Sequence, residues 1–510
     1  MSTIFIDGFD KYGPVGNSSN NGNLSSLINL DWSFNYFGAF LGSIANGLSS
    51  TGTALAFNPN NGNSFWGIGL NLSTSYTRLI GGFRMQTAHV SDCIFQFLNN
   101  GNPMCAIHVD TSGVLHLETG GAAFNSSYSG TNIASGGSIG SGVTTYVEFD
   151  ITFGSSGAYQ IWLNGISLFS GTGNTANGQA SCNEIGFGAI HGNTTLAFVV
   201  DDFYLFSSSG TTNNAVLNTN PRIETQYPTG DFQTQFSAYT ALLGTSYSIT
   251  TNTNAPGANT IFMRRYQAQV AMTLNSVSCV PEASNGTANF KAVVYNDSSG
   301  SPSGAALAVG GQVTGTTSGT TLTSTFSSGV SLTSGNYYWI GFITDTSVVL
   351  QETDTTSAGY SASNTYTSGA PTSPTMTPSQ PSWNIWGNCS SYTVNHWAEA
   401  QNPNAGDLSA IQSSTAGNED LYSYPALTTN PVNIYTMAVK CCARLSTSGT
   451  RTIDCRVSSS GTDSAGSNPG QTPTGSYAFK DSYFDTDPHT SAAWTTSGVN
   501  AAYAGPKCAS

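Results

Sequence analysis

Charged side chains are what this sequence has least of. Only 8% of its 510 residues are charged, and 13 Lys and Arg against 27 Asp and Glu give a net charge of −14. An average soluble protein carries about 25% charged residues. The basic residues are scattered singly, so the sequence offers no electrostatic footprint for a nucleic acid or for an anionic membrane surface.

Long apolar stretches and a leader segment are also missing. No window approaches the roughly 18 consecutive apolar residues of a membrane-spanning helix. The opening MSTIFIDGFDKYG has no basic region followed by an apolar run, as a signal peptide would have. We therefore expect a soluble chain made in a cytosol, without export signal and without membrane insertion.

Cysteines are few and do not follow metal-site spacing. There are nine, an odd number, and no CxxC pair occurs, which argues against structural zinc and favours reduced thiols. One pair is better placed, because MAVKCCARL and RTIDCRV flank the turn STSGT. Alternation in such a hairpin makes Cys441 and Cys455 direct cross-strand neighbours. A disulfide between them requires maturation outside the cell.

The remaining composition is that of a folded all-β protein. Apolar residues make up 38% of the chain beside 57 glycines, which is enough for cores, and the length suggests two to four domains. Helical periodicity is nearly absent. Runs of period two recur throughout, such as NFKAVVYN and YYWIGFITD, and Gly, Asn and Ser interrupt them about every ten residues. These patterns predict several β-sandwich or jelly-roll domains.

Two hairpins are predicted in the first 208 residues. In AIHVDTSGVLHLE, Val109 lies opposite Leu115, Gly113 takes the left-handed position, and His108 faces His116 on the outer face. In WLNGIS, the Asn-Gly pair at 164–165 predicts a type I′ turn.

Residues 146–206 resemble the closing half of a laminin-G/concanavalin-like jelly roll. They read as strands joined by Gly- and Asn-rich turns and end in VVDDFYLF. In that fold the first and last strands lie together, and the mirrored segments IFIDGFDKY and FVVDDFYLF suit such a pairing. The resemblance implies a recognition or structural module more often than a catalyst.

Two further segments resemble a phage virion structural protein of the tail or fibre type. A short strand, PRIETQYP at 221–228, follows DDFYLF, and DPHTSAAWTTSGVNAAYAGPK at 487–507 closes the chain. The resemblance implies three parts: a jelly roll at 1–208, a virion-type β domain at 209–236 plus 395–510, and an inserted β-sandwich at 237–394 with a Pro/Thr/Ser-rich exit linker. Insertion is tolerated where two loop ends lie close together at the surface. Plain tandem order is the alternative.

Candidate metal ligands are few. Asp201 and Asp202, with Asp7 and Asp10, offer the hard oxygen ligands that Ca²⁺ prefers. Neighbouring residues of a strand point to opposite faces, however, so hydrogen bonding at a strand end is the alternative. His108 and His116, with Glu118 on the same face, are a second candidate site for a metal or ligand, against a plain surface role.

Aromatic residues near the exit of the inserted domain are the candidate ligand site. Trp383, Trp386, Tyr392 and Trp397 have Asn and Gln neighbours, which suits sugar stacking or a subunit interface. A small satellite core is the alternative.

Catalytic motifs are lacking. There is no G-x-S-x-G elbow, no H-E-x-x-H and no phosphate-cradling loop. We therefore expect a chain that is not an enzyme. The resemblance to virion proteins implies a structural protein of a virion, assembled in the host cytoplasm and acting outside it in host attachment. Its partners would be other virion proteins, further copies of itself and a host-surface glycan. A capsid decoration protein and a polysaccharide depolymerase are the alternatives.

Overall fold

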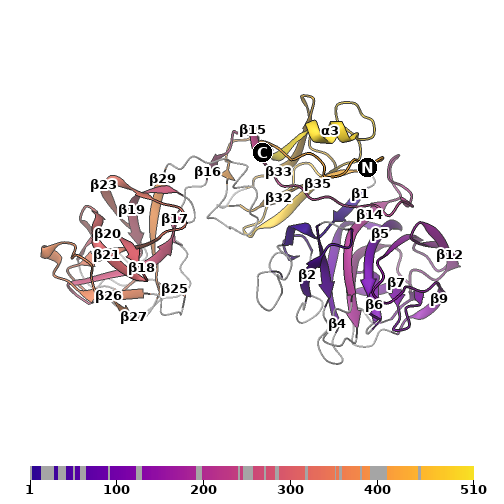
Figure 1. Ribbon diagram of the computed structural model, residues 1–510, viewed down its shortest axis with the longest axis horizontal. Helices are drawn as coiled ribbons and strands as arrows, with labels where there is room; N and C mark the ends of the chain where they lie inside the picture. Colours follow the sequence, from indigo (N-terminus) through magenta and orange to yellow (C-terminus); the bar gives the residue numbers. More distant parts are fainter. Residues whose placement is uncertain are drawn as a thin grey trace. The chain divides into compact units, whose positions relative to one another are not determined.

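Strands make up nearly all of the regular structure in the computed structural model (Figure 1). The structure describes residues 3–12, 24, 28–32, 42–49, 52–57, 65–89, 92–121, 129–190, 198–238, 242–244, 257–268, 271–281, 287–315, 320–347, 349–350, 352–354, 359–379, 382–390, 411–445 and 450–510. The chain divides into two compact units. Unit 1 comprises Met1–Phe236 and Ser413–Ser510, and unit 2 comprises Ser237–Gln412. None of the described helices is long and apolar enough to cross a membrane.

The N-terminal part of unit 1 is a jelly roll of two facing sheets. The larger sheet runs β12 (Ile166–Gly173), β11 (Gly157–Leu163), β10 (Thr145–Thr152), β5 (Arg78–Thr87), β14 (Phe198–Ser207), β3 (Thr53–Phe57) and β2 (Gly42–Asn46), and β1 (Thr3–Asp7) also pairs with β14. The smaller sheet runs β4 (Phe65–Tyr76), β13 (Cys182–Ile190), β6 (Asp92–Asn99), β7 (Asn102–Val109), β8 (Leu115–Thr119) and β9 (Thr131–Gly136). The all-β prediction is confirmed.

Local sequence signals explain the turns of this jelly roll. Strand β7 pairs with β8 in the predicted register, with Val109 opposite Leu115 and His108 opposite His116. Gly113 has a φ of 82°, which glycine adopts without steric penalty. Asn164 and Gly165 both have positive φ, as a type I′ turn requires. The pairing of the first strand with the last is also confirmed, since β1 lies antiparallel to β14.

The segment after β14 crosses the outer face of the larger sheet. There Ile80, Tyr146, Tyr204 and Phe206 form a small apolar cluster, and Val216 and Leu217 pack on it. Residues 221–228, predicted as a short strand, form none. Arg84 donates to the carbonyl of Pro221 and the Ile223 amide donates to Asp202, which attaches this segment to the jelly roll.

The C-terminal part of unit 1 joins strands from both sides of unit 2. One sheet runs β15 (Gly230–Gln233), β31 (Leu421–Ser423), β36 (Tyr503–Cys508), β33 (Ile453–Ser459) and β34 (Thr462–Ser464). The facing ribbon pairs β32 (Met437–Ala443) with β35 (Ala478–Phe484), and the short helix α3 (Thr496–Ala501) precedes β36. Cys455, Val457, Phe484 and Trp494 are among the residues of the core between them.

The predicted hairpin around residues 446–450 is wrong. Strand β32 pairs with β35, whereas β33 pairs with β34 and β36. Cys441 therefore lies opposite Lys480 and not opposite Cys455. The two thiols are still neighbours across the core, where Cys455 donates to the Lys480 carbonyl at 3.0 Å. Both cysteines are free.

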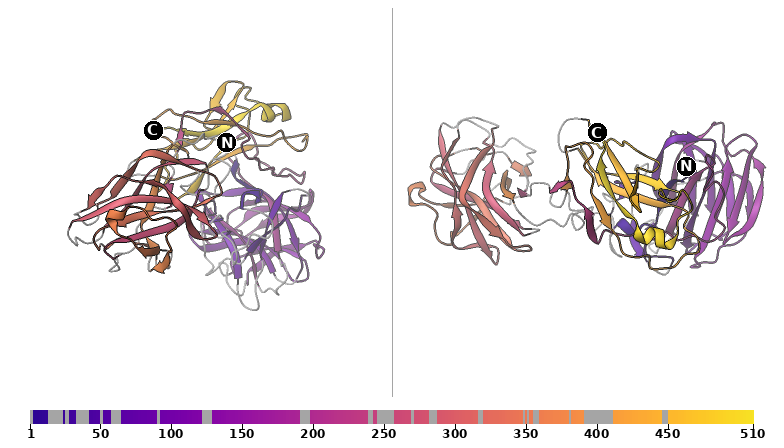
Figure 2. Two further views of the ribbon diagram at one scale, coloured as in Figure 1. Left: turned by 60° about the vertical axis from the view of Figure 1, so that its left-hand side comes forward. Right: turned by 90° about the horizontal axis from the view of Figure 1, so that it is seen from above.

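Unit 2 is a second β-sandwich, seen as two facing sheets in Figure 2. One sheet runs β17 (Leu242–Leu243), β29 (Ile385–Ser390), β19 (Met272–Cys279) and β23 (Leu322–Leu332). The other runs β21 (Ser301–Val309), β20 (Ala288–Ser298), β24 (Tyr337–Thr344), β18 (Thr260–Gln267), β26 (Gly359–Ser363) and β27 (Thr377–Ser379), with β22 (Val313–Gly315) also on β20. Two-stranded ribbons join β16 (Ser237–Ala238) to β30 (Ile411–Gln412) and β25 (Glu352–Asp354) to β28 (Ser382–Trp383).

Candidate functional site

The outer face of the smaller jelly-roll sheet carries the candidate site. Along β6 to β8, apolar side chains such as Phe95, Ile107 and Leu117 point into the core. Successive residues of a strand face opposite ways, and several of the alternate positions hold polar side chains on strands that are otherwise apolar. We call these outward residues the polar row, and they are Gln96, His108, His116, Glu118 and Glu184.

Cross-strand pairing places the polar row in two adjacent lines. In one line, Gln96 lies between Gly186 and Ala106, and Ala106 pairs in turn with Glu118. In the other, Gly188 faces Ile94, Ile94 faces His108 and His108 faces His116. The glycines leave no side chain above β13 at those points, so the functional groups gather over β6, β7 and β8.

The two histidines each lie beside a carboxylate. His108 Nδ1 is 3.5 Å from Glu118 Oε1, and His116 Nε2 is 3.3 Å from Asp110 Oδ2. The imidazole rings are 5.6 Å apart between centroids. Asp110 is held in the turn by backbone N–H groups, and although burial opposes it, these bonds and His116 lower the pKa of Asp110.

Burial decreases across the polar row. Gln96 and Glu184 are buried, and Glu184 accepts a hydrogen bond from the Gly101 amide at 2.9 Å. The side chains of His108 and His116 are 12% and 20% exposed. Asn132 and Ser135 on β9, the next strand, are exposed. Solvent and ligands therefore reach the row from the β8–β9 side.

This arrangement can bind a polar, hydroxyl-rich ligand. The two imidazoles and the carboxylate of Asp110 are partly exposed and supply hydrogen-bond donors and acceptors from one face, whereas Gln96 and Glu184 lie buried beside them. An imidazole beside a carboxylate can also accept and return a proton, which is the requirement of general acid–base chemistry.

The predicted metal ligands do not assemble into a metal site. Among the residues that the structure describes, no three His, Cys, Asp or Glu side chains are grouped as metal ligands. Asp201 accepts from the amides of Leu48 and Asp202, and Asp202 accepts from Ile223 and Arg84. Burial and the neighbouring Asp202 raise the pKa of Asp201 to about 8. Their oxygens are thus committed to hydrogen bonds within the protein.

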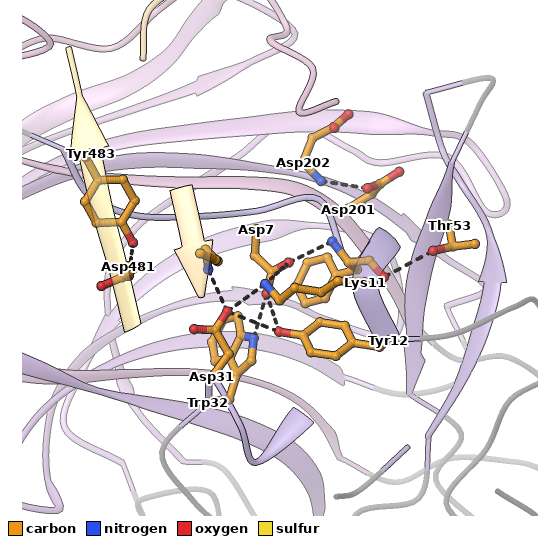
Figure 3. A network of polar contacts seen from close by, with 12 residues as sticks. Asp7, Lys11, Tyr12, Asp31, Trp32, Thr53, Asp201, Asp202, Asp481 and Tyr483 are labelled. Carbon is orange, nitrogen blue, oxygen red and sulfur yellow. Dashed lines mark hydrogen bonds and ion pairs between the residues drawn. The ribbon is translucent and has the colours of Figure 1, made fainter. Parts of the chain in front are cut away.

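Asp7, labelled in Figure 3, and Asp10 are likewise engaged in hydrogen bonds. Asp7 accepts from the Phe9 amide, the Tyr12 hydroxyl and Trp32 Nε1 at 2.8, 2.6 and 2.9 Å, and Asp10 accepts from the Thr53 amide. These bonds secure the start of the chain, including η1 (Asp10–Tyr12), against the jelly roll.

A buried ion network joins the jelly roll to the C-terminal part of unit 1 (Figure 3). Asp31 Oδ2 lies 2.6 Å from Lys11 Nζ and 2.6 Å from Lys440 Nζ on β32. Burial alone would raise the pKa of Asp31, but the two ammonium groups outweigh it and lower that pKa to about 2. Lys440 Nζ also lies 4.2 Å from the centre of the Phe5 ring. The network has a structural role.

The predicted aromatic site is not exposed where the structure describes it. Trp383 belongs to the core of unit 2 and Trp386 is also buried. The prediction of accessible rings is wrong for both: Trp383 packs in the sandwich core, and Trp386, on the opposite face of β29 from Ile385, is also covered. Tyr392 and Trp397 lie outside the described residues. Trp383 therefore has a core role, as in the satellite-core alternative, but in the main core of unit 2.

Sequence reasoning missed Gln96 and Glu184. The available signal was a lone polar residue at an outward position of a strongly apolar strand, as in CIFQFL and CNEIGFG. His108, His116 and Glu118 were predicted, whereas Asp110, the carboxylate beside His116, was not.

No protein-family model matches the chain, and no curated protein matches it in sequence. Among solved structures, it is similar to endo-β-1,4-glucuronan lyase from Trichoderma reesei, with 14% identity over 35% of this chain and 93% of that one and a TM-score of 0.25. It is also similar to the metal-free carbohydrate recognition domain of Emp46p (11% identity, 38% and 96% covered, TM-score 0.26). A third neighbour is the carbohydrate-binding module CBM66 from Bacillus subtilis (11%, 32% and 88%, TM-score 0.21). At these values the similarity carries nothing about ligand or activity.

Proposed function

We propose that this chain is a glycan-binding structural protein of a bacteriophage particle, of the tail or fibre type, used in host attachment. The observation that carries glycan binding is the polar row. Two partly exposed histidines on an outward sheet face, each beside a carboxylate, suit a ligand rich in hydroxyl groups.

The virion assignment has separate support. It comes from the order of VVDDFYLF, the linker at 221–228 and the closing segment at 487–507 in the sequence. The low charge also suits a chain whose surface is covered by copies of itself or by other virion proteins. Mass spectrometry of purified particles tests this part, and absence of the chain from the particle would rule it out.

Glycan binding is tested with host-surface polysaccharide and three variants. His108→Ala and His116→Ala remove the two partly exposed histidines of the polar row, and we expect each to weaken binding at least about tenfold, since each hydrogen bond lost leaves a polar partner unsatisfied. His489→Ala is the matched control, because His489 is an exposed histidine far along the chain, on the C-terminal part. Unchanged binding by folded His108→Ala would contradict the proposal.

A polysaccharide depolymerase is the second candidate function. The observation that favours it is the His108–Glu118 pair, which could move a proton. Incubation with the same polysaccharide, followed by assays of reducing ends and viscosity, separates the two. Bond cleavage that Glu118→Gln abolishes supports the enzyme, whereas binding without cleavage supports recognition alone.

A further inference from the structure

Unit 2 carries a second cluster of charged and aromatic side chains, separate from the polar row of unit 1. It lies on the outer face of the sheet that contains β20, β24 and β18. Arg265 on β18 pairs with Trp339 on β24, which pairs with Tyr295 on β20. Tyr337, two residues before Trp339, shares this outward face at the end of β24.

The guanidinium of Arg265 is held in one orientation. Its Nε and Nη2 atoms donate to the two oxygens of Asp297 at 2.8 and 2.9 Å, which is the bidentate arrangement. The ring of Tyr337 lies against it, with 3.7 Å between Arg265 Cζ and the ring centre. Asp297 is itself fixed by Trp339 Nε1, which donates to it at 2.7 Å.

One edge of this guanidinium faces outward. Arg265 has five N–H donors, and Asp297 takes two of them. Within the described ranges, the other three have no acceptor. The side chain of Arg265 is 35% exposed, and Tyr337 is 40% exposed, among the few large exposed hydrophobic residues. A fixed cation edge and an accessible aromatic ring therefore lie side by side.

The pair Arg78–Asp150 in unit 1 is a comparison for Arg265–Asp297, because it is a bidentate ion pair without a neighbouring aromatic ring among the described residues. It has the same bidentate geometry, at 2.7 and 2.6 Å, and a similar exposure, 37%, for its arginine. No aromatic ring is stacked on Arg78 in the described structure. Arg265 differs from Arg78 in the ring beside it, and the exposed part of that ring lies next to the outward edge of the guanidinium.

We propose that Arg265 and Tyr337 form a binding site for an acidic saccharide, a sugar residue that bears a carboxylate. The carboxylate takes the free edge of the guanidinium, and the sugar ring packs on the exposed part of Tyr337. A planar, pre-oriented guanidinium is the cation best matched to a carboxylate, and an aromatic ring supplies apolar contact to a sugar face. Asp297 already balances the arginine charge, so a single site binds weakly and several copies strengthen attachment.

The site is tested on the full chain with trigalacturonic acid and 3′-sialyllactose as probes. Saturation-transfer NMR detects weak binding, and the neutral methyl ester of each probe is the ligand control. We expect transfer to at least one acidic probe and at least about tenfold weaker binding of its ester. Failure of both acidic probes to bind, or equal binding of the esters, overturns the proposal.

The variants assign the binding to these residues. Arg265→Lys keeps the charge but loses the fork, and Tyr337→Ala loses the ring, so both should weaken binding at least about tenfold. Tyr337→Phe keeps the ring and should bind as the parent does. If Arg265→Lys fails to fold, the comparison of Tyr337→Ala with Tyr337→Phe still tests the site. Arg78→Lys is the matched control and should have no effect. Binding that survives both Arg265→Lys and Tyr337→Ala would place the ligand elsewhere. His108→Ala does not alter Arg265 or Tyr337. The test of this site can therefore fail or succeed independently of the test of the glycan site on unit 1.

Discussion

The pKa values of two buried carboxyl groups in this protein are shifted in opposite directions. Asp31 is surrounded by two ammonium groups and stays ionised far below the usual range, with its pKa near 2. Asp201, buried beside Asp202, has its pKa raised to about 8. The difference arises from the neighbours, since burial raises the pKa of both carboxyls and only Asp31 has cations beside it.

Asp31 should make unit 1 sensitive to acid. Its pKa is lowered from about 3.9 in an unfolded chain, so its contribution to stability is present above that pH and is lost as the pH falls towards 2. The loss should amount to about 2–3 kcal/mol. Urea unfolding of unit 1 between pH 6 and pH 2 measures it.

In Asp31→Asn the acid-induced loss should be smaller by that amount, although the variant is less stable at pH 6 because Lys11 and Lys440 lose their partner. Asp150→Asn, at an exposed ion pair, should retain the parental pH dependence. Parallel pH profiles for Asp31→Asn and the parent would show that Asp31 does not control acid stability.

At the scale of elements, the linker after β14 packs on the outer face of the larger sheet of the jelly roll. Leu217 and Asn218 donate from their amides to Glu148 Oε1 at 2.9 and 3.0 Å, and the Tyr204 hydroxyl donates to the same oxygen. The linker thereby covers the outer face of the larger sheet. On the outer face of the smaller sheet, the described residues are exposed toward β8 and β9, where His116, Asn132 and Ser135 lie.

Glu148→Leu should release this linker from the sheet. The substitution leaves two backbone amides and one hydroxyl without their acceptor, at about 1–3 kcal/mol for each buried group. Hydrogen exchange at Leu217 and Asn218 should become faster, while exchange in β6 and β7 stays slow. Glu148→Gln keeps an acceptor oxygen and is the matched control. Unchanged protection of both amides in Glu148→Leu would mean that apolar packing of Leu217 holds the linker by itself.

At the scale of the whole molecule, unit 1 is completed by strands on both sides of unit 2. Strand β15 pairs with β31 across the interruption. Near the two crossing points, the amides of Gln235 and Phe236 donate to Asp420, and Asn418 donates to the Gln235 carbonyl. The two ends of the interruption are therefore held together within unit 1.

Deleting Ser237–Gln412 and joining its flanks with a short Gly-Ser bridge should leave unit 1 folded. We expect its free energy of unfolding to change by less than about 1 kcal/mol, which is about 2–4 °C in Tm. Calorimetry of the shortened chain measures this. Adding Asp420→Ala removes the anchor of both flanks and should lower the Tm further. Aggregation of the shortened chain, or loss of its unfolding transition, would contradict the expectation.

The sequence by itself determined the all-β class, the β7–β8 hairpin with His108 opposite His116, and the Asn164–Gly165 turn. These depend on alternation and on backbone angles, which are local properties. Tertiary structure alone decided that β32 pairs with β35, that Trp383 is buried, and that Gln96 and Glu184 share a face with His108. Alternation assigns a residue to one side of a strand, but it does not name the strand's partner or what covers that side. Those choices depend on packing between segments that lie far apart in the chain.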